Sequence, residues 1–170
     1  MRLLAMMGST EKCDMAAMDP FSPRAGNQIE IPYFLFLTDH DQGNLPLYQE
    51  ELYIPADFDC GLGWRSVFDE HDVFGDGRVV VFATPGQSKG HQSLLVKLDS
   101  ETVMLGADAD FTAQNMRARA LPGVVWSPDG TVASWDRIKA LPKQYDARLF
   151  VSHDLDWQTG FSLAPNAWYA

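Results

Sequence analysis

Four short apolar runs in the second half of the sequence restrict the fold more than any other feature. They are rich in valine, leucine and phenylalanine, and they cover residues 79–82, 94–98, 102–105 and 149–151. Short runs of such residues, bounded by glycine, aspartate or serine, are typical of β-strands. The run 79–82 has no polar position, which predicts a strand covered on both faces.

A helix is predicted between the third and fourth runs. Ser127 is a good N-cap, and Pro128 fits the first turn, where its missing N–H costs nothing. Apolar residues then recur at helical spacing, at Val132, Trp135, Ile138 and Leu141. We expect Pro142 to end the helix. Strands mixed with helices that pack on sheets indicate an α/β (α+β) protein.

The first half of the sequence is less regular. Residues 29–37 are apolar and aromatic and predict a buried strand, which ends at the turn-forming residues 39–44. Residues 45–52 are weakly helical. Residues 19–27 are rich in proline, glycine and serine and predict a loop.

Composition and charge narrow the class of protein. The chain has 170 residues, of which 46% are hydrophobic, enough for one domain with a core. Its net charge of −10 argues against a basic surface for nucleic acid or for an anionic membrane. The apolar start is too short for a signal peptide, and no stretch is long enough to cross a bilayer. Cys13 and Cys60 are too few for a disulfide framework, so we expect a cytoplasmic protein.

Polar residues follow three of the predicted strands. Asp108 comes after the run 102–105, His153 comes after 149–151, and Gln87 and His91 lie in the loop after 79–82. Side chains at strand ends are where α/β proteins often place their sites. Carboxylate and imidazole are zinc ligands, and histidine is also a general acid or base. The alternative is structural: Asp108 caps a turn and His153 is a hydrogen-bonded core residue.

Three segments, taken together, resemble the N-acyl homoserine lactonases of the metallo-β-lactamase superfamily. Residues 84–96 (TPGQSKGHQSLLV) resemble their Thr-Pro-Gly-His-x-x-Gly-His-Gln-Ser segment. Residues 105–112 (LGADADFT) resemble their strand and loop with the zinc-bridging aspartate, and 150–154 (FVSHD) resemble their C-terminal histidine segment. The segments occur in the family's order, and residues 12–13, 29–32 and 163–169 are also similar, so the resemblance covers nearly the whole chain.

The resemblance implies an αββα sandwich, two zinc ions and hydrolysis of a small-molecule lactone or ester. It makes Asp108 a metal ligand and catalytic residue, which bridges the two zinc ions or takes a proton. It makes His153 a second metal ligand. It places Phe111 where the family has a tyrosine near the substrate carbonyl. It also implies a possible homodimer.

The sequence departs from the family at the metal ligands. The hallmark His-x-His-x-Asp-His, which supplies four of the seven ligands, is absent, and Gln87 stands where the family has another ligand histidine. We infer an internal deletion near 44–45, which makes residues 1–170 a single incomplete domain. The expected fold is therefore a partial sandwich that lacks part of its N-terminal half, with marginal stability.

Three functional hypotheses remain open. A catalytic zinc takes three protein ligands and a water, so two ligands predict an inactive or severely impaired hydrolase with no zinc, or at most one weakly bound. Alternatively, Asp108, His153 and His91 form a reduced metal site that hydrolyses lactones or esters. In the third hypothesis the chain is a non-catalytic binding or dimerisation module.

Overall fold

The computed structural model describes residues 1–41, 43–48, 69–154 and 169, with the backbone alone described for 4–11, 32–40 and 43–48. Cys60 and the family-like chain end at 163–168 lie outside these residues. The first sheet has the order β1-β2-β3 and is antiparallel, with strands β1 (Arg2–Asp14), β2 (Gln28–His40) and β3 (Gly43–Tyr48). The second has the order β4-β5-β6-β7-β8, with strands β4 (Glu70–Asp72), β5 (Val79–Ala83), β6 (Gln92–Lys97), β7 (Thr102–Leu105) and β8 (Ala147–Phe150).

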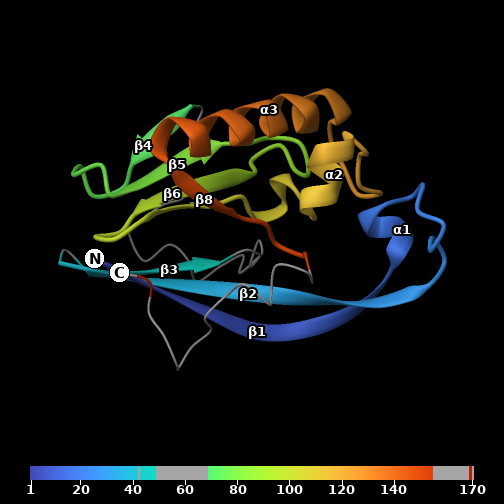
Figure 1. The fold of residues 1–170 in the computed structure, drawn as a ribbon, viewed down its shortest axis with the longest axis horizontal. Helices are drawn as coiled ribbons and strands as arrows, with labels where there is room; N and C mark the ends of the chain where they lie inside the picture. The colour runs from blue at the N-terminus through green and yellow to red at the C-terminus, as the bar shows by residue number, and fades with distance from the viewer. Residues whose placement is uncertain (42, 49–68, 155–168, 170) are drawn as a thin grey trace, which may run out of the picture.

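The two sheets and the long helix form three layers (Figure 1). Helix α3 (Pro128–Tyr145) lies along the outer face of the second sheet, and the first sheet lies along the opposite face. The short helices α1 (Met15–Met18) and α2 (Ala113–Ala118) lie together at one end. Among the described residues, no helix lies on the outer face of the first sheet (Figure 1). The α/β fold class expected from the sequence is confirmed.

The alternating directions of the side chains along β6 and β7 explain how the layers are joined. Val96 and Val103 point into a buried cluster that also contains Leu3 of β1, so they join the two sheets. Leu95 and Met104, one residue along each strand, pack instead into the cluster beneath α3. Because successive side chains of a strand point to opposite faces, both faces of β6 and β7 are covered at these positions.

Helix α3 packs by the stripe predicted from the sequence. Trp135 and Ile138 are fully buried, Leu141 is nearly so, and the Trp135 indole N–H donates to the Ala109 carbonyl at 2.8 Å. The prediction that Pro142 ends the helix is wrong, because the helix continues to Tyr145. The proline loses one backbone hydrogen bond, but the extra turn lets Tyr145 pack against the same cluster as Leu141.

The weak helix predicted at 45–52 is also wrong over its described part. Residues 43–48 form strand β3, which pairs with β2 from His40 opposite Gly43 to Leu35 opposite Tyr48. A tight turn after β2 brings the segment back alongside an existing strand, and pairing with that strand overrides a weak helical preference. The predicted deletion point at 44–45 therefore lies inside a continuous strand.

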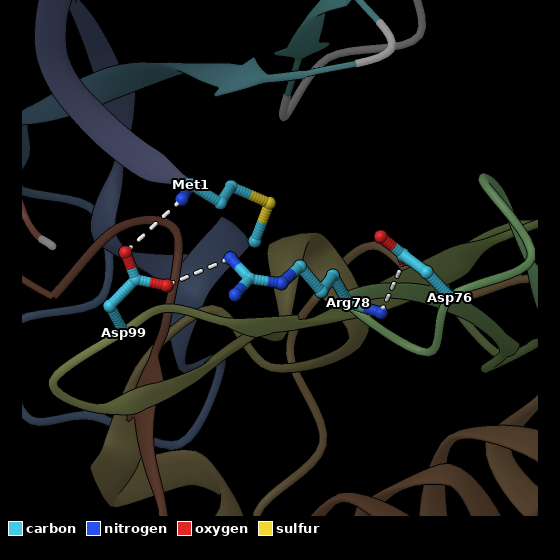
Figure 2. A network of polar contacts seen from close by, with 4 residues as sticks. All are labelled: Met1, Asp76, Arg78 and Asp99. Carbon is cyan, nitrogen blue, oxygen red and sulfur yellow. Dashed lines mark hydrogen bonds and ion pairs between the residues drawn. The ribbon is translucent and has the colours of Figure 1, made fainter.

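A polar network at the turn between β6 and β7 ties the start of β1 to the second sheet (Figure 2). The Asp99 carboxylate lies 2.9 Å from the Arg78 guanidinium and 3.4 Å from the amino group of Met1. The Asp76 carboxylate accepts from the Arg78 backbone N–H at 3.0 Å. Arg78 and Asp99 are exposed, so solvent screens their attraction, and the network mainly fixes the relative position of the sheets.

No helix in the described part of the chain has the length and apolarity that a bilayer crossing requires.

Candidate functional site

Two parallel strands bring Asp108 and His153 together. Strands β7 and β8 run side by side in the same direction, with Leu105 opposite Phe150. Asp108 and His153 each follow their strand by three residues, so both lie at the same edge of the sheet. A short 3-10 helix, η1 (Ala107–Ala109), presents Asp108. It begins with Ala107 at φ +47°, a left-handed conformation that is costly for a non-glycine residue and is often found at functional sites.

The Asp108 carboxylate and the His153 ring are in direct contact. The Oδ1 atom of Asp108 lies 3.3 Å from Nε2 of His153, and both side chains are largely buried. Burial raises the pKa of the Asp108 carboxyl, but the contact with His153, the Ser152 hydroxyl and the charge of His91 together outweigh it. The net pKa is therefore lowered, and Asp108 stays ionised at neutral pH.

Phe111 packs against His153. Its ring meets the His153 ring edge to face, with centroids 5.4 Å apart, and its carbonyl accepts from the His153 backbone N–H at 3.0 Å. It packs with Met18 and Ile31 from the N-terminal part of the chain. Phe111 therefore lies beside His153, and its ring supplies no hydroxyl.

Gln87 and His91 lie on the loop between β5 and β6. The Gln87 side chain is half-buried, and its backbone carbonyl accepts from the Trp126 N–H at 3.1 Å. No described contact brings the Gln87 side chain to Asp108 or His153. The His91 ring is mostly buried, and its Nδ1 atom contacts Thr84. His91 is close enough to Asp108 for its charge to lower the pKa of the Asp108 carboxyl.

Asp110 is a buried acid that the sequence reasoning missed. It is 2% exposed, and neither carboxylate oxygen makes a well-aligned hydrogen bond. Burial, together with the nearby charge of Asp154, raises the pKa of Asp110 to about 8. Lys139 and the backbone N–H groups of Thr112 and Met116 oppose this rise in the pKa without cancelling it. The only signal in the sequence is its place two residues after Asp108.

Asp108 and His153 have donor atoms of the kinds that would hold a zinc ion, and their Oδ1 and Nε2 atoms lie 3.3 Å apart. Oδ1 of Asp108 is also buried without a well-aligned donor. In the described part of the chain, however, no three histidine, cysteine or acidic side chains are grouped closely enough to hold a metal. The described residues therefore do not fit a catalytic zinc centre, which needs three protein ligands.

Comparisons with known proteins give one consistent result. No protein-family model matches the chain. It is 39% identical over 119 residues to an N-acyl homoserine lactonase of Rhizobium radiobacter and 31% identical over 119 residues to one of Bacillus thuringiensis. These matches cover 66% and 69% of this chain, but only 45% and 44% of the relatives. The aligned residues thus span less than half the length of the curated relatives that the chain matches.

Solved structures agree on the fold. A quorum-quenching N-acyl homoserine lactone lactonase superposes with a TM-score of 0.81 at 17% identity, over 99% of this chain and 98% of that one. An N-acyl homoserine lactone hydrolase with a bound product gives a TM-score of 0.80 at 15% identity, over 96% and 97%. The protein therefore has the metallo-β-lactamase fold. Within that class, its sequence makes it a homologue of the N-acyl homoserine lactonases.

Proposed function

We propose that this chain is a lactonase homologue whose hydrolytic activity is lost or severely impaired. The observation that carries this proposal is the ligand count: Asp108 and His153 meet, and no third described ligand joins them. The absence of His-x-His-x-Asp-His from the sequence and the glutamine at position 87 support it further. With two protein ligands, a metal is too weakly held to generate hydroxide from water at neutral pH.

The length of the relatives supports a missing portion. The 119 aligned residues are 45% of the Rhizobium radiobacter lactonase, which therefore has about 260 residues, roughly 90 more than this chain. In our proposal an internal deletion near 44–45 accounts for part of this difference and removed the hallmark. Strand β3 would then join segments that were once far apart in the sequence.

The substrate class to test is an N-acyl homoserine lactone. A solved lactonase with this fold is described with N-hexanoyl-L-homoserine at its catalytic metal centre, and another with N-decanoyl-L-homoserine at its active site. Phe111 cannot donate a hydrogen bond to a lactone carbonyl, which is a second reason to expect weak catalysis.

The first prediction concerns ring opening of N-hexanoyl homoserine lactone. A metal that activates water lowers the activation free energy of hydrolysis by several kcal/mol. Its loss therefore lowers the rate about a thousandfold or more relative to an intact lactonase. We expect the wild type, supplied with zinc at pH 7, to match Asp108→Ala and the uncatalysed background. Product is measured by chromatography, and a two-metal lactonase is the positive control. Ring opening that a chelator stops and Asp108→Ala abolishes would overturn the proposal.

A second candidate is a metal-dependent lactone or ester hydrolase with a reduced site of Asp108, His153 and His91. One observation favours it: His91 lies near enough to act on the Asp108 charge. In this candidate the His91 ring supplies the third ligand. This candidate predicts slow turnover that requires added metal and falls in His91→Gln as well as in Asp108→Ala.

A further inference from the structure

A chain of buried hydroxyl groups connects His91 to the segment that carries Asp108. Thr84 and Ser93 are fully buried, and His91 is 9% exposed. Thr84 follows β5, Ser93 lies in β6, and the Thr84 backbone N–H donates to the His91 carbonyl at 2.9 Å. The hairpin therefore holds the three side chains against one another, on the side of the sheet where η1 begins.

The direction of this chain is fixed at its far end. The Ser93 Oγ lies 2.9 Å from the carbonyl oxygen of Gly106, which can only accept, so Ser93 donates its single hydroxyl hydrogen there. The Thr84 Oγ1 lies 2.8 Å from the same Ser93 Oγ. Because the Ser93 hydrogen is already used, Thr84 must donate to Ser93.

The hydroxyl of Thr84 can then only accept from His91. The Nδ1 atom of His91 lies 2.9 Å from Thr84 Oγ1, so the hydrogen between them belongs to Nδ1. A separate contact gives the same answer, because Nδ1 also lies 3.1 Å from the Thr84 backbone carbonyl, which cannot donate. Two independent acceptors therefore face this ring nitrogen.

We propose that Thr84 and Ser93 are positioning residues that hold His91 as the Nδ1–H tautomer, so that the lone pair of the neutral ring lies on Nε2. The second ring nitrogen of a histidine is set by the hydrogen bond that the first one makes. Histidines that act as metal ligands usually donate the other ring N–H to a carbonyl or carboxylate, as His91 does here. In the second candidate function this Nε2 atom is the one that would act as a base or ligand.

This inference deepens the second candidate function, and it depends on that function only for what the lone pair serves. The tautomer is a property of the folded chain without metal or substrate. It can therefore be correct even where ring opening is absent, and it can fail even where ring opening is found. The two results are measured separately.

The test is a long-range ¹H–¹⁵N correlation spectrum of protein labelled with ¹⁵N-histidine, in chelator, at a pH where the ring is neutral. The chain has four histidines, and His91→Gln identifies the His91 signals. We expect a protonated Nδ1 and an unprotonated Nε2. A wild-type ring protonated on Nε2, or averaged between the two tautomers, would overturn the proposal without any need for a variant.

Ser93→Ala tests the chain itself. It frees the Thr84 hydroxyl hydrogen to point at Nδ1, so we expect the tautomer ratio to shift about fivefold toward Nε2–H, the equivalent of one hydrogen bond. Thr84→Ser keeps the hydroxyl and should leave the ratio unchanged. Thr131→Val removes a buried threonine hydroxyl that donates to the Ser127 carbonyl instead, and should also leave it unchanged. An unchanged ratio in Ser93→Ala would remove Ser93 from the proposal.

Discussion

Gly86→Ala is expected to lower the thermal midpoint of unfolding by about 2–12 °C, whereas Gly90→Ala in the same loop is expected to leave it nearly unchanged. A Cβ at Gly86 would lie 2.5 Å from Oγ1, 2.6 Å from Cα and 2.8 Å from the backbone nitrogen of Thr131. Side chains are not found this close, so either the loop or α3 must move. Overpacking of this kind costs about 1–3 kcal/mol, and each kcal/mol lowers the midpoint by about 2–4 °C in a chain of this size.

Neither partner can move easily. The Gly86 carbonyl accepts from the backbone N–H groups of Trp126 at 2.9 Å and Ser127 at 3.0 Å. The Ser134 hydroxyl donates to the Pro85 carbonyl at 2.7 Å. Ser127 also caps α3, so a shift of the loop would disturb the start of the helix.

Gly90→Ala is the matched control for Gly86→Ala. A Cβ at Gly90 would meet nothing within 4 Å, and a surface change of this kind alters stability by less than about 0.5 kcal/mol. Both variants are measured by circular dichroism during thermal unfolding and by urea titration. Equal midpoints would mean that the Thr84–Gly90 loop, which carries Gln87, does not pack against α3 as described.

Asp110→Asn is expected to stabilise the metal-free protein, and more so as the pH rises. The pKa of Asp110 is about 8 in the folded protein and about 3.9 in an unfolded chain. Between these values the folded state holds a proton that the unfolded state releases, so the free energy of unfolding falls as the pH rises from about 4 to about 8. Asparagine does not titrate. The expected gain near pH 8 is on the order of a few kcal/mol.

Asp136→Asn is the control for this pH dependence. Asp136 is exposed, and the Arg119 guanidinium, 2.8 Å away, lowers the pKa of its carboxyl. Its contribution to stability is therefore present above its unfolded-state pKa and lost in acid, the opposite sign to Asp110. Urea unfolding at several pH values, in chelator, compares the two variants with the wild type. If Asp110→Asn destabilised the protein at neutral pH and this loss faded in acid, Asp110 would be an ionised, hydrogen-bonded residue instead.

Local patterns in the sequence predicted much of the second sheet. Strands β5 to β8 and helix α3 follow directly from apolar runs, turn residues and the Ser127-Pro128 cap, because these signals act over a few residues. Two predictions failed for reasons that lie outside such windows. The strand at 43–48 forms because β2 lies beside it, and α3 passes Pro142 because Tyr145 packs against the core.

The site was predictable only in part. Asp108 and His153 follow their strands in the sequence, but their contact depends on β7 and β8 being parallel neighbours, which no local pattern specifies. No sequence pattern indicates the roles of Thr84 and Ser93, because small hydroxyl residues usually lie at the surface and only the folded hairpin places them beside the Gly106 carbonyl that fixes their direction. No sequence pattern indicates the raised pKa of Asp110 either, because burial and the nearby charge of Asp154 arise only in the folded protein.

In our proposal, this lactonase homologue no longer holds a catalytic metal centre. The most direct measurement is the zinc content of protein that is folded with zinc, dialysed and shown by circular dichroism to be folded. We predict close to zero zinc per chain for the wild type, as for Asp108→Ala, and a higher value for Gln87→His, which restores a histidine at the family's ligand position. One or more zinc ions per wild-type chain that survive dialysis and are lost in Asp108→Ala would contradict the account.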